Sequence, residues 1–133
     1  MATVLLLEKD SVCRQVMGLV LRKKGWYTVL EARTTPEAVT YSRRYQIDLA
    51  VIDASMRDAY PGGRAVAREL AKISPHLRFL FVSGYPQNLL VEKAVLQPDD
   101  PFLAKPFKPL ALLERVQELL ASPVSHSAVA AGS

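Results

Sequence analysis

The sequence predicts an α/β fold in which a five-stranded parallel sheet has helices on both faces. Short apolar runs alternate with segments whose apolar residues recur every three or four positions, giving five strand-then-helix units. Parallel neighbouring strands need crossover connections, and the helices supply them. The chain has 133 residues and is 50% apolar, which suits a single domain with its own core.

The first unit is a strand at 3–7 followed by a helix that stops before Gly25. The run "TVLLL" is typical of a strand covered on both faces. Asp10 or Ser11 can cap the helix, and its apolar positions follow at helical spacing: Val12, Val16, Leu19 and Val20. Gly25 favours a helix end at this point.

The second unit and the third strand continue the alternation. Residues 27–32 predict a strand, and residues 36–45 predict a helix capped by Thr34 or Thr35. The apolar run at 49–53 predicts a third strand that ends in an aspartate.

The rest of the chain supplies three helices and two strands. A helix is expected at 64–73, after the turn-rich segment "RDAYPGG", and a fourth strand at 76–83. A shorter helix at 86–95, a brief strand at 102–104 and an amphipathic helix at 109–121 complete the pattern.

We expect residues 1–121 to form one domain and residues 122–133 to form a disordered tail or linker. The last segment is rich in serine and alanine and lacks periodicity, and no role is expected for His126 within it. Apolar runs such as 77–83 are shorter than the roughly 20 residues that span a bilayer. The N-terminus also lacks the layout of a secretory signal, so we expect a cytoplasmic protein that does not bind membranes.

The formal net charge is +4, but the basic residues do not form one stripe interleaved with aromatic residues. We therefore expect solvated helix faces and no direct binding of nucleic acid by this segment; the residues concerned include Arg14, Arg22, Arg43, Arg64 and Arg68. The single cysteine, Cys13, has no partner for a disulfide or a zinc site, and we expect it to pack on a helix.

Polar residues gather where the predicted strands end, which is where open parallel sheets bind ligands. The first strand ends in "EKD" at 8–10, the third in Asp53, the fourth in Ser83 and the fifth in Lys105. No helix begins within several residues of Asp53, so a functional role is favoured over a helix cap, whereas Asp10 is interpreted as a cap.

These stretches together resemble the receiver domain of two-component response regulators, a (βα)5 flavodoxin-like receiver fold. The resemblance covers about residues 3–121 and rests on four motifs in order: "VLLLEKD", "DLAVIDASM", "LFVSGY" and "PFLAKPF". It implies a phosphoacceptor switch in a two-component phosphorelay that is not an enzyme and shows at most slow self-dephosphorylation.

The resemblance also implies roles for individual residues. Asp53 would take a phosphoryl group from a sensor histidine kinase or a phosphotransfer protein. Lys105 would bind the phosphoryl oxygens, and Ser83 would hydrogen-bond the same group and move toward it. Phe102 falls at the position of the family's switch aromatic, which would change the affinity for an output partner that the sequence does not identify. A homodimer is left open.

The magnesium site that the resemblance implies is altered in this sequence. The family's first strand typically ends in two acidic residues that hold Mg²⁺ with the phosphoacceptor, and here the second is Lys9, whose ammonium cannot be a ligand. The charges of Lys9 and Lys105 balance those of Glu8 and Asp53. We therefore expect Mg²⁺ to bind weakly, through Glu8, Asp53 and the backbone carbonyl of Ser55.

Two orientations of Lys9 are open. If its ammonium turns into the site, it pairs with Asp53 and opposes cation binding. The protein could then be a phosphorylation-independent pseudo-receiver, an interaction module in which Lys9 replaces magnesium. If Lys9 points to solvent, weak Mg²⁺ binding remains. Arg57, where the family commonly has proline, is interpreted as a solvated loop residue in preference to a phosphate contact.

An enzyme on the same architecture is the rival from another class. A flavodoxin-like enzyme would need a phosphate-binding loop after the first strand, and "EKDSVC" is a poor one. A phosphohydrolase-like enzyme usually has a second aspartate two residues after the nucleophile, where this chain has Ser55.

Overall fold

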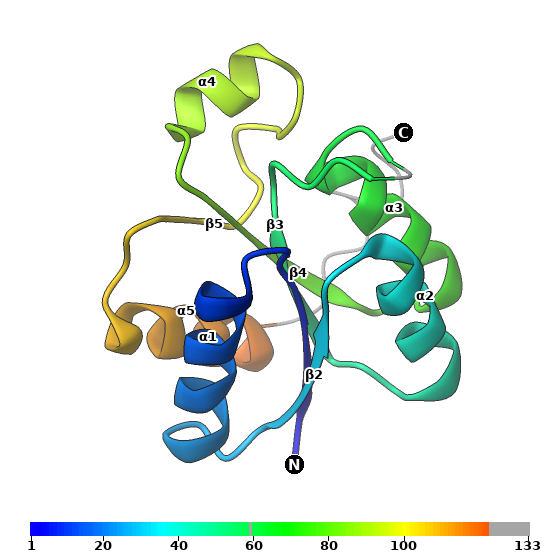
Figure 1. Cartoon of the computed structure of the whole chain (residues 1–133), viewed down its shortest axis with the longest axis vertical. Helices are drawn as coiled ribbons and strands as arrows, with labels where there is room; N and C mark the ends of the chain where they lie inside the picture. Colours follow the sequence, from blue (N-terminus) through cyan, green and yellow to red (C-terminus); the bar gives the residue numbers. More distant parts are fainter. Residues whose placement is uncertain (59, 123–133) are drawn as a thin grey trace.

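A computed structural model of the chain describes residues 1–58 and 60–122 (Figure 1). Of the tail expected after residue 121, only Ser122 belongs to the described residues. The rest of that segment, including His126, lies outside them. The described residues contain five strands and five helices in alternation, as the sequence predicts. None of the helices within these ranges is long and apolar enough to cross a membrane.

The strands form one parallel sheet in the order β2-β1-β3-β4-β5. Their bounds are β1 Thr3–Leu7, β2 Thr28–Ala32, β3 Leu49–Asp53, β4 Arg78–Ser83 and β5 Phe102–Ala104. The chain winds from β1 toward one edge to make β2 and then toward the other edge from β3 onward. The crevice of such a sheet opens between β1 and β3, at the carboxyl ends of the strands.

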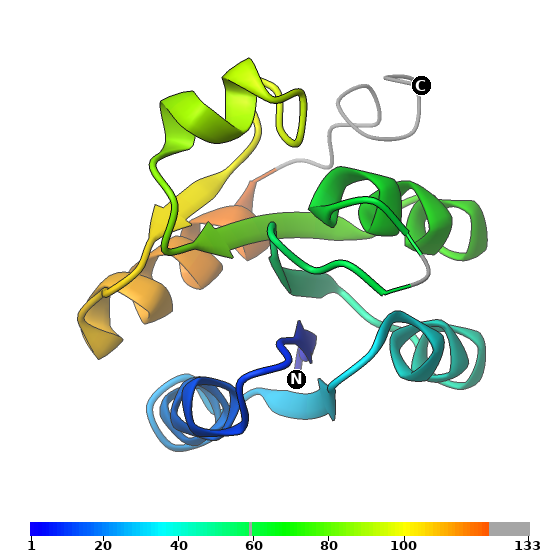
Figure 2. The same cartoon turned by 45° about the horizontal axis from the view of Figure 1, so that its top comes forward.

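The helices cover both faces of the sheet (Figures 1 and 2). Their bounds are α1 Ser11–Lys23, α2 Thr35–Arg44, α3 Gly63–Ile73, α4 Gln87–Glu92 and α5 Pro109–Ala121. Helices α1 and α5 lie together on one face, and α2, α3 and α4 lie on the other. Successive strand residues point to opposite faces, so Leu5 packs under α2–α4, and its neighbour Leu6 packs under α1 and α5.

Helix caps explain where α1 and α2 begin. The Asp10 side chain accepts a hydrogen bond from the backbone N–H of Cys13, and the Thr34 hydroxyl accepts one from the N–H of Glu37. Of the alternatives left open by the sequence, Asp10 and Thr34 are thus the N-caps.

Helix α4 is shorter than predicted: it ends at Glu92, whereas the sequence predicts a helix at 86–95. Ala94 adopts a φ of 60°, and the N–H of Val95 donates to the carbonyl of Leu90. This left-handed turn ends the helix without the glycine that usually marks such an end.

Two basic residues expected on solvated helix faces are instead buried: Arg14 is 7% exposed and Arg64 is 4% exposed. Arg14 Nε lies 3.3 Å from Glu31 Oε1, and Arg64 pairs with Asp100 at 2.6 Å. The expectation was wrong for both, because each guanidinium finds a carboxylate far away in the sequence. Cys13 is half-buried and packs against the apolar cluster beneath α1 and α5, as expected.

Candidate functional site

The predicted site residues follow the strands to the same edge of the sheet. Glu8 comes directly after β1 and Asp53 ends β3, beside β1 in register, with Leu7 opposite Ile52. Ser83 ends β4, and its carbonyl accepts a hydrogen bond of 2.8 Å from the backbone N–H of Lys105. The fold therefore places residues from four strand ends around one crevice.

Lys105 connects the two carboxylates of this crevice. Its Nζ forms an ion pair with Glu8 Oε1 and lies 3.6 Å from Asp53 Oδ2. The side chain of Glu8 is 2% exposed, that of Asp53 14% and that of Lys105 22%. Because the three groups are shielded from water, the positive charge of Lys105 interacts strongly with both carboxylates.

The surroundings shift the pKa values of Glu8 and Lys105. Burial raises the pKa of Glu8; the hydrogen bond from Lys105 offsets part of this, and the negative charge of Asp53 raises it further. Burial alone would lower the pKa of Lys105, but the hydrogen bond to Glu8 and the charges of Asp53 and Glu8 outweigh it and raise this pKa.

The two oxygens of Asp53 differ in their surroundings. Oδ1 accepts hydrogen bonds from the backbone N–H of Ser55 at 3.0 Å and from its hydroxyl at 2.7 Å. Oδ2 lies 3.6 Å from the Lys105 ammonium, and its lone pairs can attack an electrophile in the crevice. The next helix begins only at Gly63, so Asp53 caps no helix.

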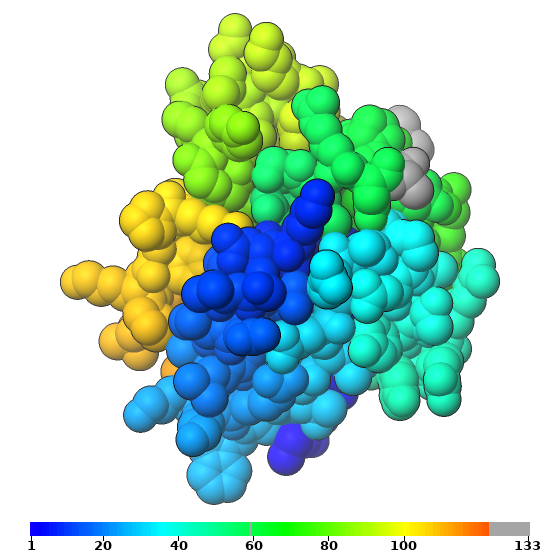
Figure 3. Space-filling model, in the orientation of Figure 1, coloured from blue at the N-terminus to red at the C-terminus, as the bar shows by residue number. Residues whose placement is uncertain are grey.

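A cavity of about 390 Å³ opens beside Asp53. Its lining comes from the segments that follow β1, β2 and β3: Lys9, Arg33, Thr34, Asp53, Ser55, Met56, Arg57 and Asp58. Figure 3 shows the β1–α1 segment, in blue, at the surface between the cyan and green segments that follow β2 and β3. Lys9 is exposed and forms no ion pair with Asp53 among the described residues, which corresponds to its solvent-facing orientation.

Ser83 and Phe102 are near the crevice but do not contact Asp53 through any described hydrogen bond. Ser83 is fully buried, and its Oγ accepts a hydrogen bond of 3.0 Å from the N–H of Tyr85. Phe102 is half-buried and lies opposite Phe81 in the β4–β5 register.

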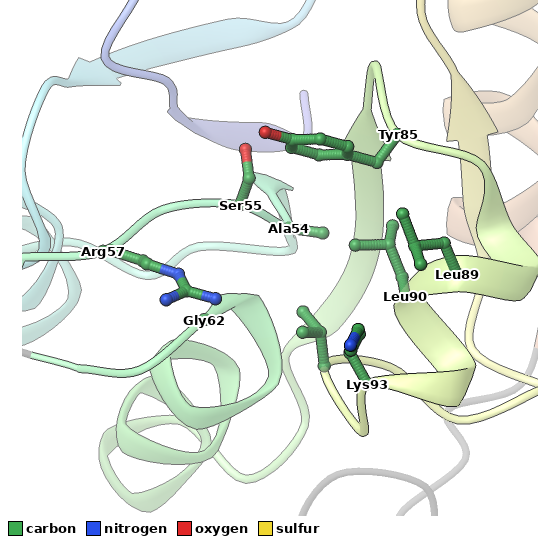
Figure 4. A pocket seen from close by; sticks show the side chains of 9 residues that line it. Ala54, Ser55, Arg57, Gly62, Tyr85, Leu89, Leu90 and Lys93 are labelled. Carbon is green, nitrogen blue, oxygen red and sulfur yellow. The ribbon is translucent and has the colours of Figure 1, made fainter.

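A second cavity, of about 360 Å³, separates the β3–α3 loop from α4 (Figure 4). Ser55 and Arg57 line both cavities, and Tyr85 and Lys93 contribute to the second. A Cβ on Gly63 would come within 2.8 Å of Ala54 Cα, so glycine is required for the close approach of α3 to the residue after Asp53.

Arg33 and Asp58 are charged residues of the first cavity that were not predicted from the sequence as site residues. Arg33 follows directly after β2, and its place at the end of a parallel strand is the sequence signal for it. Asp58 had no such signal. It accepts hydrogen bonds from the N–H of Thr35 at 2.6 Å and from its hydroxyl at 2.7 Å, which ties the β3–α3 loop to the start of α2.

The donor set does not fit Mg²⁺ well. Within residues 1–58 and 60–122, no group of three His, Cys, Asp or Glu side chains is placed to hold a metal ion. Glu8 and Asp53 share the Lys105 ammonium, and Lys9 adds a further positive charge to the lining of the cavity beside Asp53. Mg²⁺ prefers near-octahedral oxygen coordination, usually from one or two carboxylates and several waters, and here both carboxylates already share the Lys105 ammonium.

Comparison with known proteins gives a consistent result. A family model described as "Response regulator receiver domain" matches residues 4–117. The chain is 34% identical over 121 residues to the sensor kinase CckA of Brucella abortus, covering 90% of this chain but only 12% of that protein. It is 24% identical to the chemotaxis protein CheY of Thermotoga maritima, covering 87% of this chain and 95% of CheY. The crystal structure of a Thermotoga maritima response regulator superposes with a TM-score of 0.77 at 25% identity, covering 92% and 99% of the two chains.

Proposed function

Because this chain belongs to the response regulator receiver domain family, we propose that Asp53 accepts a phosphoryl group from a sensor histidine kinase or a phosphotransfer protein. Receiver domains generally act as switches and not as enzymes, and their signalling is of the two-component type. The matched range supports residues 1–121 as the receiver unit, and we place its action in the cytoplasm.

The observation that carries this proposal is the setting of Asp53. Its carboxylate ends β3 at the point where the sheet order reverses, faces a cavity and lies 3.6 Å from the Lys105 ammonium. Phosphoryl transfer depends mainly on positioning and on neutralising charge, and both are provided here.

The proposed step transfers the phosphoryl group from nitrogen to oxygen. Asp53 Oδ2 attacks the phosphorus of a phosphohistidine, and a P–O bond forms as the P–N bond breaks. The electron pair of that bond stays on the imidazole, and the product is an acyl phosphate on Asp53. Slow attack by water on the phosphorus would return the carboxylate and free phosphate.

The switch would be transmitted through Ser83 and Phe102. We propose that the Ser83 hydroxyl leaves the N–H of Tyr85 to bond the phosphoryl group, which moves the β4–α4 loop. Phe102 and the short helix α4 would then change the affinity for an output partner or for a second copy of this chain.

Receiver domains typically bind Mg²⁺ at the phosphorylation site. In this chain the remaining oxygen donors are Glu8, Asp53 and the Ser55 carbonyl, and we propose that they bind the ion only weakly. The pseudo-receiver alternative requires an ion pair between Lys9 and Asp53. The described residues contain none, which favours the phosphoacceptor over that alternative.

Intact-mass spectrometry tests the proposal. After incubation with a small acyl phosphate, with and without magnesium, the wild-type protein is expected to gain the mass of one phosphoryl group. Asp53→Asn is expected to gain none, whereas Asp99→Asn, which alters an exposed aspartate outside both cavities, should be labelled like the wild type. If the wild-type protein were labelled neither with nor without magnesium, the proposal would be overturned.

A further inference from the structure

Three cations without ion-pair partners line the cavity that contains Asp53. Lys9 follows β1, Arg33 follows β2 and Arg57 lies in the β3–α3 loop, so three separate segments bring them to the same cavity of about 390 Å³. All three are exposed, and none forms an ion pair with another residue of the described ranges. Their convergence on the proposed phosphoacceptor leaves three positive charges available to a ligand.

The charge of the whole site suits a phosphoryl dianion. The cations are Lys9, Arg33, Arg57 and Lys105, and the carboxylates are Glu8, Asp53 and Asp58. With all of them ionised, one positive charge remains. Phosphorylation replaces the single negative charge of Asp53 with a group carrying about −2 at neutral pH, which brings the site to neutrality.

We infer that Lys9, Arg33 and Arg57 hold the phosphoryl group on Asp53 in place of a divalent cation, so that this receiver is phosphorylated without magnesium. The inference rests on the proposed function of Asp53. Guanidinium groups bind phosphate oxygens in pairs, and the Lys9 ammonium acts as a compact point charge at the position where the metal would need an acid. The poor fit of the site to Mg²⁺ has the same origin, because Lys9 stands where a second acid after β1 would add an oxygen ligand.

The transfer needs no further reactant. With a small acyl phosphate as donor, Asp53 Oδ2 forms a bond to phosphorus while the bond between phosphorus and the carboxylate oxygen of the donor breaks. The leaving carboxylate keeps the electron pair. The three cations neutralise the charge on the transferred oxygens during this step.

The test compares phosphorylation rates in EDTA and in magnesium by intact mass, with acetyl phosphate as donor. The wild-type protein is expected to be labelled in EDTA at a rate within about threefold of that in magnesium. The variant Lys9→Gln/Arg33→Gln/Arg57→Gln should lose at least about tenfold in EDTA. A matched control, Lys23→Gln/Lys24→Gln/Arg43→Gln, removes the same charge from exposed positions outside the cavity and should retain the wild-type rate.

The outcomes separate this inference from the proposed function. Labelling of the wild-type protein only in magnesium overturns the inference and leaves Asp53 as the phosphoacceptor. Equal rates for the two triple variants in EDTA also overturn it. Labelling in neither condition overturns the proposed function. A second experiment tests the three cations as an anion site independently of phosphorylation. Orthophosphate, added in EDTA, should raise the Tm of the wild-type protein but not that of Lys9→Gln/Arg33→Gln/Arg57→Gln. Equal Tm shifts would overturn the cluster as an anion site.

Discussion

The Lys105 ammonium lies 3.6 Å from Asp53 Oδ2 and at the same time forms an ion pair with Glu8. One lysine from the end of β5 thus holds together carboxylates from the ends of two neighbouring strands, β1 and β3. The two carboxylates repel each other, so their approach in a shielded crevice depends on the cation between them.

Removal of this cation should destabilise the fold. In Lys105→Met, Glu8 stays buried beside Asp53 without its partner, and the free energy of unfolding at neutral pH should fall by about 2 kcal/mol. The double variant Lys105→Met/Glu8→Gln should recover more than half of that loss, because no buried carboxylate is left unpaired. Urea unfolding of the wild-type protein, Lys105→Met, Glu8→Gln and the double variant measures the effect. If the double variant were as unstable as the single one, the ion pair would not be the cause.

The raised pKa of Glu8 predicts how stability depends on pH. Between the ordinary value of 4.5 and the higher pKa of the folded state, the folded protein holds a proton that the unfolded chain has released. Stability from this group is therefore complete below pH 4.5 and is lost as pH rises through the folded pKa. Glu8→Gln cannot titrate, so its Tm relative to the wild type should increase as the pH rises from 4.5 through the folded pKa of Glu8.

The control for this titration is Glu92→Gln, which changes an exposed glutamate at the end of α4. Its Tm relative to the wild type shows the effect of the same substitution at an exposed position. Parallel curves for Glu8→Gln and the wild type would contradict the raised pKa.

Local signals predicted the fold well, and contacts between distant residues account for what was missed. Apolar runs and caps such as Asp10 depend on neighbours in the sequence, so the sequence contains them. Asp53, Ser83 and Lys105 could be found because parallel strands end at one edge. The Arg64–Asp100 pair joins residues 36 positions apart, and no periodicity indicates it. The orientation of Lys9 could not be predicted either. It depends on whether the Lys105 ammonium already lies beside Asp53, and only the structure shows that contact.

The Arg64–Asp100 pair should be a major contributor to the link between α3 and the segment before β5. Arg64 is 4% and Asp100 3% exposed, and their closest atoms are 2.6 Å apart. Arg64→Met leaves a buried charge unpaired and should cost about 3–5 kcal/mol of unfolding free energy. Arg64→Met/Asp100→Leu should be more stable than Arg64→Met alone. Differential scanning calorimetry measures both, and Arg43→Met, at an exposed position, should change little. A loss of less than about 1 kcal/mol in Arg64→Met would show that the pair is not important for stability.

The left-handed turn at Ala94 offers a stabilising substitution. At a φ of 60°, a residue with a Cβ is destabilised by about 1–2 kcal/mol through steric strain. Glycine has no such strain, but it loses more conformational entropy on folding, which offsets part of the gain. Ala94→Gly should therefore raise the free energy of unfolding by about 0.5–1 kcal/mol in urea. Lys93→Gly is the matched control, because Lys93 has a φ of −84° and gains nothing from glycine. Equal effects of the two substitutions would contradict the explanation.

Replacing Lys9 with an acid should strengthen the weak magnesium site proposed for the wild-type chain. Lys9→Asp places a third carboxylate beside Glu8 and Asp53 and removes the competing ammonium. At a magnesium concentration about ten times its Kd, the variant should be stabilised by about 1.4 kcal/mol, while the wild-type protein at that concentration should shift much less. Thermal unfolding in EDTA and in magnesium measures the difference. Lys23→Asp makes the same charge change on the exposed face of α1 and should respond to magnesium like the wild type. If Lys23→Asp responded as strongly as Lys9→Asp, the effect would be one of net charge. If the wild-type protein also responded equally, Lys9 would not be the residue that weakens cation binding.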